Sequence, residues 1–204
     1  MNVEQIMTLA PVIPVLVIHD VRHARPIAEA LVAGGLPALE VTLRTDCALD
    51  VIREMAKVEG AVVGAGTVLN PDDVKASVDA GARFLVSPGL TERLGDAAIG
   101  SGLPFLPGTA NAGDVMRGLD MGLTHFKFFP AMANGGPAAL KAIAAPLYMA
   151  KFCPTGGITE ANAPEWLALD AVLCVGGSWV VPAGEPDVKE IEMRARAAMG
   201  LRRT

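Results

Sequence analysis

The chain has 204 residues, of which 51% are apolar, and it carries a net charge of −5. This length suits one domain over residues 1–204 with a substantial core. The acidic balance without a basic cluster disfavours nucleic acid as a partner, and no apolar run reaches the roughly 18 residues of a membrane span. Three scattered cysteines and the lack of a signal-peptide pattern over residues 1–10 predict a reduced, cytoplasmic protein.

Short apolar segments alternate with helix-like segments along the chain. A short helix is expected first, over residues 1–9, and a last helix over residues 187–199. Between them, strands are expected over residues 12–18, 38–43, 61–64, 84–86, 104–106, 125–129, 148–153 and 171–175. The helix-like segments between the strands end at glycines, which accept the positive φ of a helix C-cap: Gly34-Gly35, Gly60, Gly81, Gly102 and Gly122.

This alternation predicts parallel strands joined by right-handed crossovers, and eight such units predict a (β/α)8 TIM barrel. An open doubly wound sheet is the main alternative. In a barrel of this kind the chemistry lies at the C-terminal ends of the strands. Polar side chains at those ends are therefore the candidates for a functional site.

The second strand carries a charged face. Side chains alternate between the faces of a strand, so Glu40, Thr42 and Arg44 share one face and apolar residues share the other. The apolar face is expected to pack on helices, which leaves the charged face directed into the barrel mouth. An ionic network that only fills the barrel is the alternative, although buried charges are costly unless they are paired.

The sixth strand places one lysine among phenylalanines. By the same alternation, Phe126 and Phe128 face the helices and Lys127 faces the barrel interior, with His125 deeper on that inner face. Burial disfavours a charged ammonium group, and a free amine can attack a ketone to form a Schiff base. Strands two and six lie opposite one another in a barrel, so Lys127 and Glu40 can converge. A structural lysine that only pairs with Glu40 is the alternative.

Glycines mark the ends of three further strands. The segments are Gly64-Ala65-Gly66-Thr67, Thr155-Gly156-Gly157 and Gly176-Gly177-Ser178. Glycines let a ligand approach backbone N–H groups, and loops after strands seven and eight of barrels often bind phosphate through amides and a helix N-terminus. Neither of these two loops contains lysine or arginine, and ordinary turn glycines are the alternative. No His, Cys, Asp and Glu cluster has the spacing of a metal site, so no metal is expected; His19 closes strand one and could touch a ligand.

Six motifs follow one another along the chain. They are Glu40-Val41-Thr42-Leu43-Arg44-Thr45, Gly64-Ala65-Gly66-Thr67-Val68, Ser87-Pro88-Gly89, Phe126-Lys127-Phe128-Phe129-Pro130-Ala131, Pro154-Thr155-Gly156-Gly157 and Gly176-Gly177-Ser178-Trp179. In this order they resemble the bacterial 2-keto-3-deoxy-6-phosphogluconate (KDPG) aldolases of the Entner–Doudoroff pathway and their kin, the 4-hydroxy-2-oxoglutarate (KHG) aldolases. The resemblance extends over essentially the whole chain.

The resemblance implies a class I aldolase, a cytoplasmic homotrimer without a cofactor. Its expected reaction cleaves KDPG to pyruvate and glyceraldehyde 3-phosphate, and it extends to KHG, which yields pyruvate and glyoxylate. Lys127 is implied to be the Schiff-base lysine and Glu40 the general acid and base. The other implied residues are Arg44 and Thr67 for the substrate carboxylate, Thr155 and Pro88 for substrate contact and stereochemistry, and Gly156, Gly157, Gly177 and Ser178 for the phosphate.

The chain departs from the family in two places. Residues 15–18 are apolar where some branches carry an arginine, so carboxylate binding depends more on Arg44, and Thr109 replaces the aliphatic residue of many relatives. The preference among phosphogluconate-derived, phosphogalactonate-derived and hydroxyoxoglutarate substrates therefore stays open. A sugar-phosphate epimerase or isomerase, and a non-catalytic binder of phosphorylated ligands, are alternatives that leave Lys127 among phenylalanines unexplained.

Overall fold

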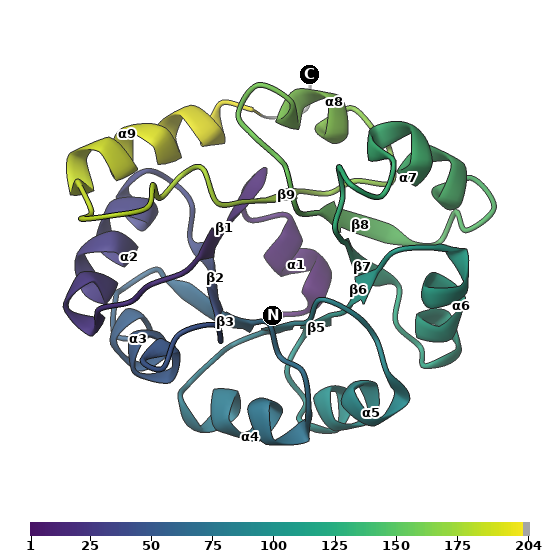
Figure 1. The fold of residues 1–204 in the computed structure, drawn as a ribbon, viewed down its shortest axis with the longest axis horizontal. Coiled ribbons are helices and arrows are strands. Elements are labelled where there is room, and N and C mark those ends of the chain that lie inside the picture. Colours follow the sequence, from purple (N-terminus) through teal and green to yellow (C-terminus); the bar gives the residue numbers. More distant parts are fainter. Residues whose placement is uncertain (202–204) are drawn as a thin grey trace.

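Short strands and helices alternate along the chain (Figure 1). The computed structural model describes residues 1–201. The strands in this part are β1 (Val12–Leu16), β2 (Ala38–Thr42), β3 (Val62–Gly66), β4 (Leu85–Val86), β5 (Phe105–Leu106), β6 (Gly108–Thr109), β7 (His125–Phe128), β8 (Lys151–Pro154) and β9 (Val175–Gly177). The helices are α1 (Val3–Met7), η1 (Val21–His23), α2 (Ala24–Ala33), α3 (Ala48–Met55), α4 (Pro71–Asp79), α5 (Glu92–Gly100), α6 (Ala112–Asp120), α7 (Gly136–Ala144), α8 (Ala163–Leu167) and α9 (Val188–Met199). None of these helices is long and apolar enough to cross a membrane.

The strands form a strongly curled parallel arrangement with helices α2 to α9 on its outer side (Figure 1). One sheet has the order β5-β4-β3-β2-β1-β9 and the other the order β6-β7-β8, and all the strand pairs are parallel. Two isolated bridges, Phe152↔Val172 and Thr155↔Gly176, connect β8 with the segment that contains β9. The predicted α/β fold with parallel strands is therefore confirmed.

One predicted strand, residues 104–106, continues beyond its expected end and is divided into β5 and β6. Pro107 stands between the two parts and has no N–H group with which to continue a strand ladder. Its carbonyl oxygen still accepts a hydrogen bond of 2.8 Å from the N–H of Lys127. As a result, β5 pairs with β4 on one side, whereas β6 pairs with β7 on the other.

Several helices begin at polar caps, and several are followed by glycines. Asn70 and Asn111 precede α4 and α6, and each side chain accepts a hydrogen bond from a backbone N–H in the first turn. Of the glycines predicted to end helices, Gly34 is helical with a φ of −76°, whereas the others have positive φ, with values of 94° for Gly35, 84° for Gly60, 89° for Gly81, 75° for Gly102 and 81° for Gly122. The sequence predicts these helix ends because each depends only on residues within one turn of the end.

The interior of the curled sheet is apolar toward the N-terminal ends of the strands. Ile6 and Met7 of α1 belong to one buried cluster with Ile13, Val62 and Phe84, and Figure 1 shows α1 inside the ring of strands. A larger apolar cluster fills the space between the strands and the outer helices. With these regions filled by apolar side chains, the buried polar residues other than Ser77 of α4 lie in the strands or just after their C-terminal ends.

Candidate active site

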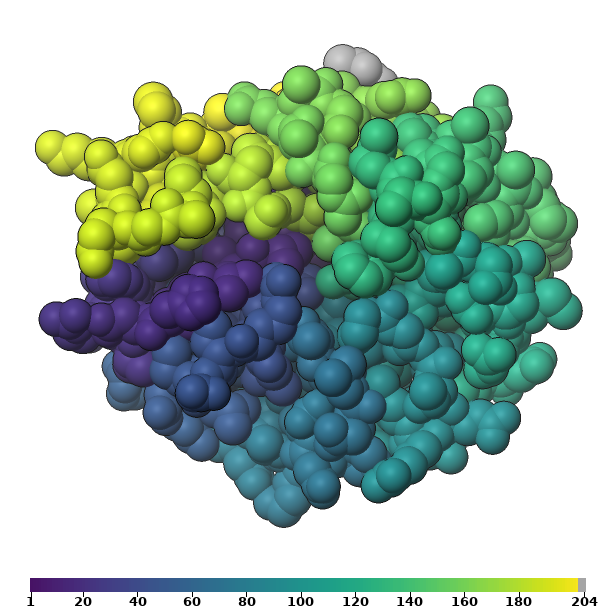
Figure 2. Space-filling model, viewed as in Figure 1, coloured from purple at the N-terminus to yellow at the C-terminus, as the bar shows by residue number. Residues whose placement is uncertain are grey.

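A cavity of about 300 Å³ opens at the C-terminal ends of the strands, where the sequence predicts the site. The face shown in Figure 2 is hollowed near its centre, where purple, blue and green segments meet. The residues that line the cavity are Val15, Glu40, Thr42, Arg44, Thr67, Pro88, Lys127, Phe129, Thr155, Gly156, Gly157, Ile158, Gly176 and Ser178. The structure thus brings the predicted site residues together, with the exception of Gly177.

Lys127 and Glu40 meet inside this cavity. Nζ of Lys127 donates a hydrogen bond of 3.0 Å to Oε1 of Glu40, and the two residues are 6% and 3% exposed. Their strands are far apart in sequence, and the alternation predicted for β7 is confirmed because Phe126 and Phe128 belong to the outer apolar cluster. A buried amine and a carboxylate at this distance can exchange a proton and act as nucleophile and general base.

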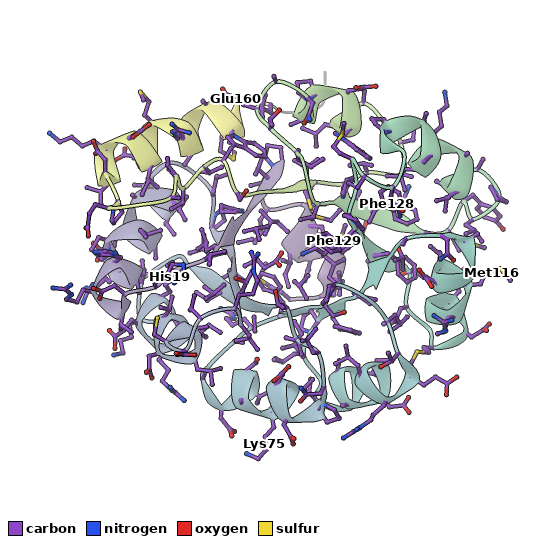
Figure 3. The ribbon with its side chains drawn as sticks, in the orientation of Figure 1. His19, Lys75, Met116, Phe128, Phe129 and Glu160 are labelled. Carbon is purple, nitrogen blue, oxygen red and sulfur yellow. The ribbon has the colours of Figure 1, made fainter. Side chains whose placement is uncertain are left out.

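Phe129 also lines the cavity, although it was not among the predicted site residues. Nζ of Lys127 lies 5.6 Å from the centroid of its ring, a distance at which the ring face stabilises a cation. Figure 3 shows Phe129 near the centre of the ring of strands, whereas Phe128 packs outward against Trp166 with ring centroids 6.3 Å apart. The signal was present, because Phe129 stands two residues from Lys127 and so follows the same inward face.

At three glycines a protein side chain takes the space that a Cβ atom would fill, and the approach of a ligand to their backbone N–H groups stays a prediction. A Cβ atom at Gly66 would overlap the carboxylate of Glu40, and one at Gly176 would overlap Oγ1 of Thr155. A Cβ atom at Gly177 would overlap the ring of Trp179, so this position faces away from the cavity. The lack of a side chain at Gly66 and Gly176 therefore makes room for Glu40 and Thr155, which both line the cavity.

Arg44 and Thr67 lie on the same side of the cavity, at the ends of β2 and β3. Arg44 is exposed, and its Nε donates a hydrogen bond of 3.2 Å to Oγ1 of Thr42. Thr67 has a φ of 60°, a left-handed conformation that is rare for a residue with a branched Cβ. Strain of this kind concentrates at functional sites, because the surrounding structure must hold the residue there.

The loops after β8 and β9 line the side of the cavity opposite Arg44 and Thr67. Gly156 and Gly157 have φ values of 104° and 77°, and Ser178 follows the last residue of β9. The expectation of a helix N-terminus at this point was wrong, because after Ser178 the next helix begins only at Val188. Backbone amides and the hydroxyl group of Ser178 remain as the groups that could hold an anion here.

Other candidates lie elsewhere. His19 is exposed and lines a separate cavity of about 690 Å³ between the end of β1 and residues 181–186. Thr109 is buried, and its hydroxyl donates a hydrogen bond of 3.3 Å to the carbonyl oxygen of Lys127. His125 is half-buried at the start of β7. Within residues 1–201 there is no group of three His, Cys, Asp or Glu side chains that could hold a metal ion.

Comparison with known proteins finds relatives of the whole chain. The family model described as KDPG and KHG aldolase matches residues 3–194. The KHG/KDPG aldolase of Escherichia coli is 56% identical over 183 residues, which cover 89% of this chain and 86% of that protein. A crystal structure of the KDPG aldolase of Zymomonas mobilis with 3-phosphoglycerate has a TM-score of 0.98 and 57% identity, covering 99% of this chain and 97% of that one. The KDPG aldolase of Legionella pneumophila, with pyruvate captured as a covalent carbinolamine intermediate, has a TM-score of 0.92 and 43% identity, covering 100% of this chain and 99% of that one.

Proposed function

The chain belongs to the KDPG and KHG aldolase family, and from this membership we propose that it cleaves KDPG to pyruvate and glyceraldehyde 3-phosphate. It is a carbon–carbon lyase, and the proposed chemistry is that of a lysine Schiff base. The observation that carries the proposal is the 3.0 Å contact between Nζ of Lys127 and Oε1 of Glu40 inside the cavity. The pyruvate captured covalently in the Legionella pneumophila relative supports the same chemistry.

The reaction begins with the amine of Lys127. Glu40 accepts a proton from Nζ, and the free amine attacks the C2 carbonyl carbon of the substrate to form a carbinolamine. Glu40 returns its proton to the hydroxyl group of the carbinolamine, which leaves as water, so that an iminium ion forms and Glu40 is again a carboxylate. The iminium withdraws electrons from the C3–C4 bond and so makes a carbanion equivalent at C3 accessible.

Cleavage then depends on Glu40. Its carboxylate removes the proton of the C4 hydroxyl group, the C3–C4 bond breaks, and its electron pair moves toward the iminium nitrogen. Glyceraldehyde 3-phosphate leaves, and an enamine of pyruvate remains on Lys127. Glu40 returns a proton to C3, and water hydrolyses the imine to release pyruvate. A positioned carboxylate contributes roughly 10²–10⁴-fold to such proton transfers.

Substrate binding is divided between the two sides of the cavity. We assign the carboxylate to the side with Arg44 and Thr67, because a guanidinium group binds a carboxylate through two parallel hydrogen bonds. The phosphate is assigned to the opposite loops. The residues proposed there are Gly156, Gly157 and Ser178, with the amide of Gly177, while Thr155 and Pro88 contact the aldehyde portion and influence stereochemistry.

The same imine chemistry applies to shorter keto acids. The Escherichia coli relative is named a KHG/KDPG aldolase, and cleavage of KHG to pyruvate and glyoxylate is proposed here as a second activity. A panel assay of pyruvate release from KDPG, its galactonate-derived epimer and KHG ranks these substrates. With a phosphate site, kcat/KM for KDPG should exceed that for KHG by at least about 10², as one or two charge-assisted hydrogen bonds allow.

Borohydride reduction in the presence of pyruvate tests the proposed chemistry. We expect a reduced pyruvyl group on the peptide that contains Lys127, and none after Lys127→Arg, whose guanidinium cannot act as a nucleophile. Lys151→Arg is the matched control, because Lys151 lies at the other end of the neighbouring strand β8, and it should keep the modification. Modification at Lys151 or Lys141 instead, or an epimerase activity without any trapped imine, would refute the proposal.

We also propose that the strands close into a (β/α)8 barrel, in which β5 and β6 form one strand interrupted at Pro107. The bridges between β8 and the segment of β9 support closure on one side, and the chain continuity from β5 to β6 supports it on the other. The family resemblance supports a cytoplasmic homotrimer with pyruvate and phosphorylated keto acids as its partners. A monomer mass by light scattering at micromolar concentration would contradict the trimer.

A further inference from the structure

We propose that Thr42 is a positioning residue that orients the guanidinium group of Arg44 toward the substrate carboxylate. The proposal rests on the function assigned above to Arg44. Thr42 is the last residue of β2, lines the cavity and is only 2% exposed. A polar side chain that is buried so deeply must satisfy its hydrogen-bonding capacity within the protein.

The hydroxyl group of Thr42 has its proton committed to the backbone. Oγ1 donates a hydrogen bond of 2.8 Å to the carbonyl oxygen of Leu16, the last residue of β1. A hydroxyl group has one proton, so toward any other neighbour Oγ1 can only accept. That neighbour is Nε of Arg44, at 3.2 Å. Two hydrogen bonds in series therefore connect the guanidinium group of Arg44 to the main chain of β1.

This connection leaves the outer part of the guanidinium group available to a ligand. Nε is occupied by Thr42, whereas no acidic side chain in the described part of the chain forms an ion pair with Arg44. Arg44 is exposed, and a long exposed side chain loses conformational entropy when a ligand orders it. A hydrogen bond that orders Arg44 beforehand reduces this loss and so strengthens carboxylate binding.

A second threonine provides a matched control. Thr45 follows Arg44, is half-buried, and its hydroxyl donates a hydrogen bond of 2.8 Å to the carbonyl oxygen of Ile18. Thr42 at the end of β2 and Thr45 after it are thus each tied to the segment of β1 by a hydrogen bond of 2.8 Å. Of the two hydroxyl groups, the one of Thr42 bonds the guanidinium group. Replacing each threonine by valine therefore separates the orientation of Arg44 from the anchoring of the loop.

The first measurement is the pyruvate concentration that gives half-maximal borohydride trapping on Lys127, together with kcat and KM for KDPG. Thr42→Val should raise both the half-saturating pyruvate concentration and KM about tenfold, because one hydrogen bond to a charged group is lost. The variant should change kcat by less than about threefold. Thr42→Ser keeps the hydroxyl and should restore both values to within about twofold. Thr45→Val should leave both values unchanged.

A double-mutant cycle with Arg44→Gln shows whether Thr42 acts through Arg44. In the Arg44→Gln background, adding Thr42→Val should change the half-saturating pyruvate concentration by less than about twofold, because no guanidinium group remains to orient. An equal effect in both backgrounds, or an equal effect of Thr45→Val, overturns the role of Thr42 and leaves the aldolase function standing. If Arg44→Gln alone has no effect, the carboxylate role of Arg44 fails, and the role of Thr42 fails with it.

A measurement on the wild type covers the case in which Thr42→Val does not fold. The Nε–H proton of Arg44, assigned by NMR through its loss in Arg44→Lys, should exchange with water at least about tenfold more slowly than that of Arg93, which is exposed. Exchange of the Arg44 proton as fast as that of Arg93 would overturn the proposal.

Discussion

Among the residues that the structure describes, Thr67 is the one residue other than glycine with a positive φ, at 60°. Holding a Cβ in this conformation costs about 1–2 kcal/mol. Thr67→Gly and Thr67→Ala both remove the hydroxyl proposed to bind the substrate carboxylate, so both should raise KM, but only the glycine variant removes the strain. We expect the glycine variant to be more stable than the alanine variant by about 1 kcal/mol in urea unfolding. An alanine variant as stable as the glycine variant would show that Thr67 is not strained.

A second prediction at the scale of single residues concerns Glu40, whose Oε1 lies 3.0 Å from Nζ of Lys127. Glu40→Gln keeps the shape of the side chain and loses the base. Turnover of KDPG should fall by at least about 10², whereas borohydride trapping of pyruvate on Lys127 should survive at a slower rate. Glu59→Gln, at an exposed position, is the matched control and should leave turnover unchanged. Near-normal exchange of the pyruvate methyl protons in Glu40→Gln would contradict the assignment of Glu40 as the proton carrier.

At the scale of elements, the loops after β8 and β9 form the side of the cavity proposed to bind phosphate. Ser178 is exposed and lines the cavity. Ser178→Glu places a negative charge there, and Ser178→Gln adds nearly the same volume without charge. Ser178→Glu removes the hydroxyl donor and introduces a charge that repels the phosphate. It should therefore lower kcat/KM for KDPG at least about tenfold more than kcat/KM for the same keto acid without its phosphate. The glutamine variant also loses the hydroxyl group but adds no charge, so its loss of kcat/KM for KDPG should be smaller than that of the glutamate variant. Equal losses for both substrates in Ser178→Glu would show that these loops do not bind phosphate.

At the scale of the whole molecule, the two ends of the strands differ in polarity, and His125 lies toward the apolar end. Burial lowers the pKa of His125 below its usual 6.5, the carboxylate of Glu4 opposes this shift and Lys151 adds to it. Its Nε2 is buried without a hydrogen-bond partner in the described part of the chain. Between the lowered pKa of the folded protein and 6.5, the unfolded chain binds more protons at His125 than the folded chain does. The free energy of unfolding therefore rises with pH in this range, and the contribution of neutral His125 to stability is lost as the pH falls below about 6.5.

His125→Gln should therefore weaken the decrease in unfolding free energy between pH 7.5 and pH 5, measured by urea unfolding at one protein concentration. His19→Gln, at an exposed position, is the control and should keep the wild-type pH dependence. The same slope in His125→Gln as in the wild type would assign the pH dependence to other groups.

The sequence by itself determined the order of the elements, their parallel direction and the inward faces of two strands. Local rules are sufficient for these features. A period of two places Lys127 inward between outward phenylalanines, and the same period places Glu40 inward on its own strand. A glycine such as Gly81 ends a helix because its positive φ is a property of one residue. The two side chains then meet because parallel strands of a curled sheet end at one face.

Only the tertiary structure decided which atoms fill the remaining space. The overlap that excludes a side chain at Gly66 comes from Glu40, and the one at Gly177 comes from Trp179. The bond from Thr42 to the carbonyl oxygen of Leu16 likewise joins two strands that are separated by a helix in the chain. Packing and hydrogen bonding are sensitive to shifts of a few tenths of an ångström between elements, and no local pattern of residues specifies distances on that scale.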